Sequence, residues 1–535
     1  MNYVSKRLLI CLTGWALCTT SCTAFLPKRH TADEGTIPQS YTDYVAETER
    51  PERWWEAFES DELNALMEEA FAENLTLRQM WARLDQADAA AIKAGADLYP
   101  QLSLEASASY DRSVRSVEGS STSLKSQLGN AVVNGVTQGV SRGISSAISG
   151  GQGGLGNLGF GGGRTTGGQT TGGRVTTETK QFGLSLTASY ELDIWGRVRS
   201  ERQSARFDLE ASREDMESAA MTVAAEVVNR WLGIIEQQAQ KQLLEDQLKT
   251  NQTYLELVEL RFRKSLVSAL DVYQQRQTVA GVKKQIPLIE SQERVLRHEL
   301  AVLLGKPPAT EYLLGGYDLE KVPPLPRLGV PAKLLINRPD VRAALGRLNA
   351  ADYRVAVARA DQLPAIRLTG GIGYSADDFS NLFNDWFVNL AGNLTAPLFD
   401  GFRRAAEVDR TKAVVEERLA AYRLAVLTAI KEVEDALVQE RKQREHIAAL
   451  TQQLEDARNA LREAGQRYQK GLSDYLPVLT SLEGTQFLTR NLITARRDLL
   501  IFRVNLYRAL GGIWTNDLEP PRRLSEEDSL VKAEK

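Results

Sequence analysis

Two parts of this 535-residue chain repeat each other at fixed offsets, and this internal repeat constrains the fold more than any other feature. Residues 74–112 align with residues 338–376 at an offset of 264 positions, and residues 181–306 align with residues 387–512 at an offset of 206. A repeat of this length predicts two copies of one structural unit. The two offsets differ by 58 residues, which indicates one large insertion in the first copy.

The N-terminus has the layout of a secretory signal. Lys6 and Arg7 precede a short apolar run, and small residues follow it before Cys22. Residues 1–21 are therefore predicted to be a signal peptide. The residues before Cys22 resemble a bacterial lipobox, so Cys22 is expected to become the lipidated (palmitate-bearing) first residue of a lipoprotein. An ordinary signal peptide, cleaved nearby, is the alternative.

Composition and motifs argue against several classes of function. The chain has a net charge of −4 and no basic field, which excludes an ordinary nucleic-acid-binding domain. A dinucleotide-like glycine pattern at 154–159 lacks the flanking strand and helix that such a site needs. The three histidines have no metal-ligand spacing, and no catalytic constellation is present. We expect no enzyme activity, no metal and no cofactor.

Each copy is predicted to contain a helix, a pair of strands and a long helical hairpin. The first copy is expected over 61–306, with a helix over 61–97, strands at 98–112 and 181–193, a Gly-rich loop at 113–180 and a hairpin at 196–306. The second is expected over 340–512, with strands at 364–376 and 387–399 and a hairpin at 401–512. An N-terminal segment (22–60), a Pro-rich linker (307–339) and a C-terminal tail (513–535) complete the chain.

The predicted strands alternate strictly between apolar and polar residues. Leu102 and Leu104 alternate with Ser103 and Glu105, and the other three strands show the same period of two. This pattern predicts a sheet with one apolar and one polar face. Strands of a soluble sandwich look similar, but four strands among some 400 helical residues give a sandwich nothing to pair with. The pattern is also typical of membrane β-barrel strands.

The predicted hairpins are too long for a globular domain. The segment from Gly196 to Phe262 has no proline and is rich in helix formers, so a single helix there would approach about 100 Å. The second copy is equally long. Such helices are typical of coiled-coil hairpins, which turn near Lys264 and near Lys470.

These residues together resemble the TolC/OprM-like family of outer-membrane efflux channels, nearest its lipoprotein (NodT-type) branch. The resemblance covers nearly the whole mature chain, including Trp54-Trp55, the segment Asn337 to Asp340, both strand pairs and both hairpin turns. It implies an α+β membrane protein, a homotrimer in which each chain gives four strands to one 12-stranded β-barrel. A long periplasmic α-helical barrel would continue it. Four strands cannot close a barrel alone, and lipid does not tolerate open edges, so the strands independently require other subunits.

The resemblance also implies a function and roles for single residues. The chain would be the passive exit duct of a tripartite RND-type efflux system for small toxic compounds, in the outer membrane of a Gram-negative bacterium. Its partners would be outer-membrane lipid, a periplasmic adaptor protein and an inner-membrane pump, without nucleic acid. The adaptor would dock on the two hairpin turns: Lys264, Ser265, Leu266, Lys470, Gly471 and Leu472. A periplasmic gate would use Tyr468, Asp271 and Asp474.

Two alternatives stay open from the sequence. A type I secretion duct for proteins would share the fold, and a periplasmic coiled-coil scaffold without a pore would share the hairpins. The chain also departs from the best-known member of the family, because Ser473 stands in place of a latch arginine. Pro477 and Thr480 stand in place of its ring of aspartates.

The gate assignment gives a first prediction. Removing the side chains of Tyr468 and Asp271 together should raise single-channel conductance in a planar bilayer, because a contact that holds the entrance shut would be lost. Conductance equal to that of the wild type would exclude this pair as the latch.

Overall fold

The computed structural model describes residues 53–116, 174–312, 314–326, 337–512 and 514–520. Cys22 and the centre of the Gly-rich loop therefore lie outside the described residues. The chain divides into a sheet unit (97–193 and 364–397) and a helical unit that contains the remaining residues. Each unit takes residues from both copies of the repeat, so the compact units do not follow the copies. The reason is that strands of both copies share one sheet and helices of both copies share one core.

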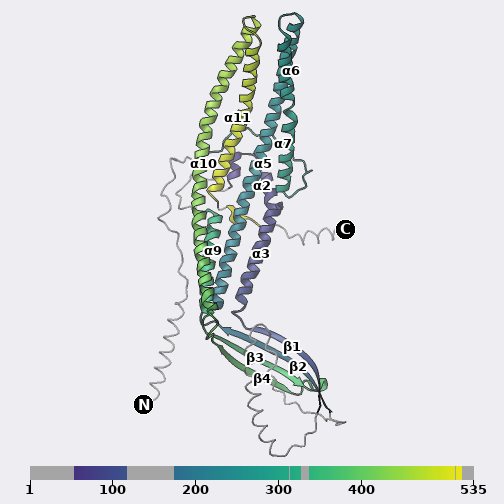
Figure 1. Ribbon diagram of the computed structural model, residues 1–535, viewed down its shortest axis with the longest axis vertical. Helices are drawn as coiled ribbons and strands as arrows, with labels where there is room; N and C mark the ends of the chain where they lie inside the picture. Colours follow the sequence, from purple (N-terminus) through teal and green to yellow (C-terminus); the bar gives the residue numbers. More distant parts are fainter. Residues whose placement is uncertain (1–52, 117–173, 313, 327–336, 513, 521–535) are drawn as a thin grey trace, which may run out of the picture. The chain divides into compact units, whose positions relative to one another are not determined.

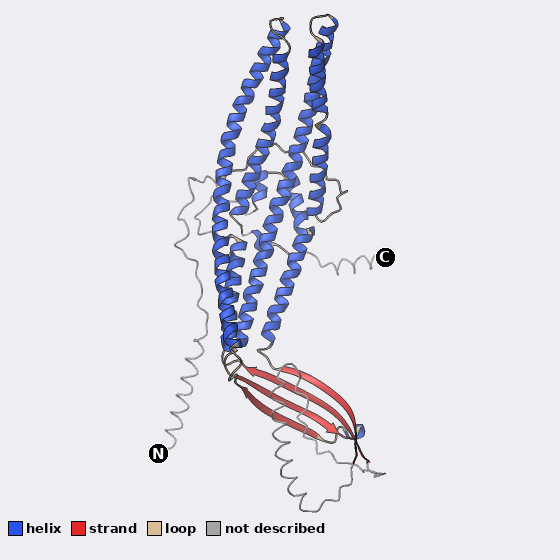
Figure 2. Ribbon diagram, viewed as in Figure 1, coloured by secondary structure: helices blue, strands red, loops and turns tan. Residues whose placement is uncertain are grey.

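The sheet unit is a four-stranded antiparallel sheet in the order β1-β2-β3-β4 (Figure 2). The strands are β1 (Gln101–Ser116), β2 (Arg174–Leu192), β3 (Ala365–Ala376) and β4 (Trp386–Thr395). Successive strands pair with each other, including β2 of the first copy with β3 of the second. Within the described residues, the outer edges of β1 and β4 have no strand partner.

The register of the sheet puts the apolar alternate residues of all four strands on one face. One row across the sheet consists of Leu104, Leu186, Ile372 and Val388. The next row, on the opposite face, consists of Ser103, Thr187, Gly371 and Asn389. Ser103 and Thr187 share a hydrogen bond of 2.7 Å between their hydroxyl oxygens. The predicted division into an apolar and a polar face is confirmed.

Three predicted strand boundaries are wrong. β1 ends at Ser116 and β2 begins at Arg174, so both strands extend into the predicted loop 113–180. The reason is that Val114 and Thr176 are β-branched residues, which favour strands. β4 ends at Thr395 instead of residue 399, shortly before Pro397, whose nitrogen has no hydrogen to donate to a sheet.

Two long hairpins dominate the helical unit (Figure 1). The first hairpin consists of α5 (Arg197–Arg263), α6 (Ala269–Lys283) and α7 (Ile286–Leu303). The second hairpin consists of α10 (Arg403–Gln469) and α11 (Leu476–Ala509). The remaining helices are α2 (Asp61–Glu73), α3 (Leu75–Ala96) and α9 (Pro339–Ala360). No helix among the described residues combines the length and apolarity needed to cross a bilayer.

Two helices that the sequence predicts as continuous are interrupted. Asn74 separates α2 from α3, because its Oδ1 accepts a hydrogen bond from the Leu77 nitrogen (3.0 Å) and starts a new helix. Pro287 lies in the first turn of α7 and cannot donate to the preceding turn, so the return helix breaks at Lys284 and Gln285. Ile493 occupies the equivalent position in the second hairpin, where α11 is continuous.

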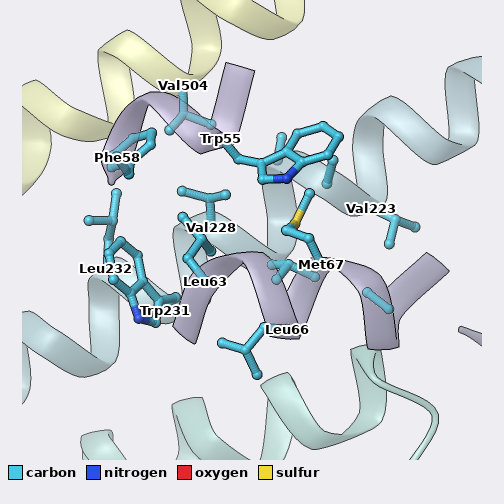
Figure 3. Close-up of a cluster of buried hydrophobic side chains, with 14 of the residues drawn as sticks. Trp55, Phe58, Leu63, Leu66, Met67, Val223, Val228, Trp231, Leu232 and Val504 are labelled. Atoms are coloured by element: carbon cyan, nitrogen blue, oxygen red, sulfur yellow. The ribbon is translucent and has the colours of Figure 1, made fainter. Parts of the chain in front are cut away.

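The main core joins the N-terminal segment and the C-terminal tail to the hairpins. Figure 3 shows side chains of the 3-10 helix η2 (Trp54–Phe58), α2, α5 and α11 that converge there. Trp54 stacks on Tyr507 of α11 with ring centroids 5.5 Å apart. Trp514, in the short helix η5 (Trp514–Asp517), packs edge-on against Trp55 at 4.8 Å. The predicted tail 513–535 therefore begins with residues that belong to the core.

The two copies make the same contacts where each hairpin ends. Asn74 donates to the Leu303 carbonyl (2.6 Å), and the equivalent Arg338 donates to the equivalent Ala509 carbonyl (3.1 Å). Gly305 (φ 70°) and its equivalent Gly511 (φ 72°) lie against the backbone of Glu73 and Asn337, which are also equivalent. The repeat therefore preserves three-dimensional contacts as well as sequence.

This contact generates a second prediction. Gly305→Ala should lower the free energy of unfolding by about 2–5 kcal/mol, because it combines left-handed strain with a severe clash. The new Cβ would lie 2.3 Å from the Glu73 carbonyl oxygen. Gly401→Ala is the control, because Gly401 also has positive φ (64°) but nothing within 4 Å of a Cβ. Thermal unfolding followed by circular dichroism measures both; equal midpoints would contradict the argument.

Candidate functional site

The two hairpin turns have the same backbone structure. At the first turn the Leu266 nitrogen donates to the Arg261 carbonyl (2.9 Å), and at the second the Leu472 nitrogen donates to the Arg467 carbonyl (2.8 Å). Each of these hydrogen bonds joins a backbone nitrogen to the carbonyl five residues earlier and forms a Schellman motif at the C-terminal end of the outgoing helix. The motif needs one residue with positive φ, which is Ser265 (57°) in one turn and Gly471 (72°) in the other. Glycine adopts this conformation without strain, whereas serine does not.

The turns differ where the return helices begin. Ser268 and Asp271 form a capping box at the start of α6: Ser268 donates from its backbone nitrogen and hydroxyl to the Asp271 carboxylate (2.9 Å each). The start of α11 has no side-chain cap, and Pro477 takes the place of Asp271. The first turn is therefore fixed by side-chain hydrogen bonds that the second lacks.

The predicted docking residues all lie at these turns and are exposed. Leu266 and Leu472 present large apolar side chains to solvent, next to the exposed Lys264 and Lys470. Both turns are in one helical unit and lie near each other in Figure 1. A surface that pairs exposed leucines with cations suits binding of another protein, because apolar anchors provide affinity and charge provides orientation.

The predicted gate residues are close together but do not bind each other. The Asp271 carboxylate accepts hydrogen bonds from Ser268, and the buried Tyr468 hydroxyl has no hydrogen-bond partner among the described residues. The structure shows no hydrogen bond between Tyr468 and Asp271. The reason is that the capping box holds the carboxylate on its own helix. Asp474 is exposed in the second turn.

The partner of Tyr468 is Arg261, which sequence reasoning missed. The Arg261 guanidinium lies 4.2 Å from the centre of the Tyr468 ring, and its Nη1 donates to the Tyr468 carbonyl (3.3 Å). A cation over an aromatic face is favourable. Burial raises the pKa of the Tyr468 hydroxyl, so Tyr468 stays neutral at physiological pH. Arg261 thus joins the turn of the first hairpin to that of the second.

A small apolar cluster lies beneath the turns. It includes Val258 and Val272 of the first hairpin and Tyr468, Tyr475 and Val478 of the second. The rings of Tyr468 and Tyr475 lie 5.2 Å apart. This cluster holds the two hairpins together near their ends.

Below the cluster, the hairpins are joined by buried amide side chains, here called the amide ladder. The Tyr475 hydroxyl donates to Gln275 Oε1 (2.7 Å), and Gln275 Nε2 donates to the Asn251 carbonyl (2.8 Å). Asn251 Nδ2 in turn donates to Gln486 Oε1 (3.1 Å). Gln275 and Asn251 have no exposed surface. Buried amides need these partners, so the ladder fixes the alignment of α5 with α11.

The ladder continues along α5 with charged groups. Arg490 donates to Gln247 Oε1 (2.6 Å). Farther along, Glu236 accepts from the Thr494 hydroxyl (2.7 Å) and pairs with Arg497 (3.0 Å). The contact between hairpins is therefore polar. The contact between α10 and α11 inside the second hairpin combines an apolar stretch, with Leu450, Leu454, Leu488 and Leu492, with the buried ion pair of Arg503 and Glu440.

The sequence contains a signal for this ladder. Gln240, Gln247 and Asn251 follow each other at spacings of seven and four on α5, which places them on one helical face. A coiled-coil seam with that spacing usually carries apolar residues, so polar residues there indicate that the two helices pack in one fixed alignment.

Among the described residues, no group of His, Cys, Asp or Glu side chains could hold a metal ion.

The amide ladder generates a third prediction. Gln247→Leu should lower the free energy of unfolding by about 1.5–3 kcal/mol, because it leaves the Arg490 guanidinium without this acceptor. Gln453→Leu is the matched control, because Gln453 is the repeat equivalent of Gln247 but is exposed, and its loss should cost about 0.5 kcal/mol or less. Thermal unfolding in detergent would show the difference; equal shifts for the two variants would show that the ladder does not contribute.

Comparison with known proteins gives a family match. The sequence model described as outer membrane efflux protein matches residues 66–134, 157–306 and 330–512, which is more than half of the chain. The gap in this match falls within the insertion of the first copy.

Two similar curated proteins come from Pseudomonas putida. The "Pyoverdine export outer membrane protein OpmQ" of Pseudomonas putida is 31% identical over 514 residues, which cover 95% of this chain and 98% of that protein. The "Toluene efflux pump outer membrane protein TtgF" of Pseudomonas putida is 31% identical over 348 residues, 64% of this chain and 71% of that protein.

Solved structures share the fold. The structure of the outer-membrane channel OprN superposes with a TM-score of 0.74 at 24% identity, and covers 92% of this chain and 100% of that one. At this identity the likeness supports the fold alone.

Proposed function

Because the chain belongs to the outer membrane efflux protein family, we propose that it is the outer-membrane exit channel of a tripartite RND-type efflux system. In this role it conducts small toxic compounds out of the cell and catalyses no reaction. The energy and the selectivity come from an inner-membrane pump, which an adaptor protein links to the channel. The near-complete coverage of an export protein of the outer membrane supports the assignment.

The observation that carries the proposal is the two-faced sheet with two open edges. The exposed apolar row of Leu104, Leu186, Ile372 and Val388 suits lipid, and the opposite polar row suits a water-filled lumen. The edge strands β1 and β4 need partners inside a bilayer. Three copies that pair β4 of one with β1 of the next would close a 12-stranded barrel, so we propose a homotrimer.

The hairpins fit the periplasmic part of such a channel. We propose that they form the helical barrel and that the turns, with Leu266, Leu472, Lys264 and Lys470, bind the adaptor. Tyr468, Asp271 and Asp474 remain the proposed gate, to which the position of Arg261 over the Tyr468 ring adds a fourth residue. Cys22 remains the proposed site of lipidation, and an acyl chain there would add to the membrane attachment that the barrel provides.

The substrate class is broad among the relatives. Their names refer to pyoverdine, to toluene and to solvents. The described residues contain no feature that distinguishes these compounds, in keeping with a duct that receives whatever its pump delivers.

Deletion of the gene and complementation test the proposal. The deletion strain should become more sensitive to at least one compound in a panel of antibiotics, dyes, solvents and metals, and the wild-type gene should restore resistance. If no compound in the panel becomes more toxic and none accumulates, the efflux assignment fails.

Two variants on adjacent residues of β4 sharpen the experiment. Leu390→Arg places a charge on the apolar face, which costs about 2–4 kcal/mol at a bilayer midplane. It should therefore reduce the amount of channel in the outer membrane and fail to restore resistance. Asn389→Arg, on the polar face, should insert normally. Equal insertion of both variants would contradict the proposed orientation of the sheet in lipid.

A further inference from the structure

The polar face of the sheet carries one aromatic side chain, Phe387 of β4. The register places Phe387 opposite Gly373 and on the same face as Asn389, two residues farther along the strand. The row across the sheet that contains it consists of Glu105, Ser185, Gly373 and Phe387. No other aromatic residue of the four described strands lies on this face. A single phenyl ring therefore interrupts a surface of polar and small side chains.

The Phe387 ring reaches over Gly373 of the neighbouring strand. A Cβ atom added to Gly373 would lie 2.9 Å from Cζ of the ring and 2.8 Å from Ser185 Cβ, closer than side-chain carbons approach one another. Glycine at position 373 therefore leaves the space into which the ring extends. The Phe387 side chain is still 41% exposed, so much of the ring stays open on the polar face.

The first copy has a polar pair in the equivalent place. The repeat offsets relate Gly373 to Ser109 and Phe387 to Gln181, and Ser109 and Gln181 also lie opposite each other. The next row carries no apolar side chain in either copy, with the pairs Ser107–Gly183 and Gly371–Asn389. The two copies therefore differ at one cross-strand pair, where the second copy combines a ring with the glycine that accommodates it.

We propose that Phe387 is a contact site for aromatic solutes in the lumen of the channel. The inference rests on the proposed function, in which the polar face lines the lumen and small compounds pass along it. An aromatic solute can stack on the open ring or pack edge-on against it, and both arrangements remove apolar surface from water. Three copies would bring three such rings to one level of the lumen. The contact needs only a ring face, so it accepts aromatic compounds of different size and excludes no other compound.

A small solute is the fitting occupant of this site. The exposed apolar area is a single ring, which is far below the area that a stable protein interface buries. Its neighbours on the same face, Ser185 and Asn389, are polar and do not suit lipid chains. The Ser185 hydroxyl and the Asn389 amide can instead hydrogen-bond polar substituents of a solute whose ring lies on Phe387.

Binding of two uncharged probes to the full-length channel in lipid nanodiscs tests the site. The probes are N-acetyl-tryptophan amide and N-acetyl-leucine amide, which differ only in their side chains, and saturation-transfer NMR measures their binding after subtraction of empty nanodiscs. Phe387→Ser should weaken binding of the tryptophan probe by about two- to tenfold and change that of the leucine probe less. Gln181→Ser, at the repeat equivalent, is the matched control and should change neither.

A gain of binding provides an independent test. The double variant Ser109→Gly/Gln181→Phe rebuilds the glycine and ring pair in the first copy. It should add a second contact site to each chain and raise binding of the tryptophan probe by about twofold. If Phe387→Ser does not assemble, Phe387→Leu keeps an apolar side chain without a ring and should still weaken binding of the tryptophan probe.

A ring over a strand glycine can also stabilise a sheet by covering its backbone, and the measurements separate this role from solute binding. If Phe387→Ser has the oligomeric state of the wild type and binds the tryptophan probe equally well, the inference is wrong, even if the variant unfolds at a lower temperature. The gene deletion tests the duct separately. Efflux without binding that depends on Phe387 keeps the proposed function and removes the site, whereas such binding without efflux removes the proposed function alone.

Discussion

Among the described residues no strand pairs with the outer edges of β1 and β4, and this is the constraint on which the proposed assembly depends. In lipid each unpaired backbone group costs several kcal/mol unless it finds a partner, so a four-stranded sheet with an apolar face is not complete as a monomer. In the proposed channel, neighbouring copies provide these partners.

The duplicated chain keeps equivalent contacts where they shape the backbone and changes them where two surfaces meet. Gly305 and Gly511 preserve the same close approach, and Asn74 and Arg338 cap the same helix ends. The interface between hairpins is different. Asn251 and Gln486 have alanines as their equivalents, Ala457 and Ala280, so the second copy does not repeat this hydrogen bond. The duplication therefore supplies one backbone framework twice, and later divergence gives the two copies different side-chain contacts.

Much of this fold could be predicted from the sequence, because periodicity reports burial directly. The alternation from Leu102 onward predicted the strands and their two faces, and the long segments free of proline predicted α5 and α10. The strand ends at Ser116 and Arg174 were missed because Gly-rich composition outweighed a short β-branched pattern. The cap at Asn74 was missed because helical periodicity continues through it. The turns were located correctly. The partners of Tyr468 and Asp271 were not, because they depend on which side chains compete locally: Ser268 for the carboxylate and Arg261 for the ring.

The interruption at Lys284 and Gln285 makes the two hairpins mechanically unlike. The return helix of the first hairpin has a joint between α6 and α7, because Pro287 has no backbone hydrogen to donate to the preceding turn. The joint separates α6, which the amide ladder joins to its neighbours through Gln275, from α7, whose Leu300 lies in the main core. The second turn has no such joint, since α11 is one rod of 34 residues whose far end includes Tyr507, packed against Trp54. The first turn is therefore linked to the main core through one unbroken helix, α5, and the second is linked to it through α11.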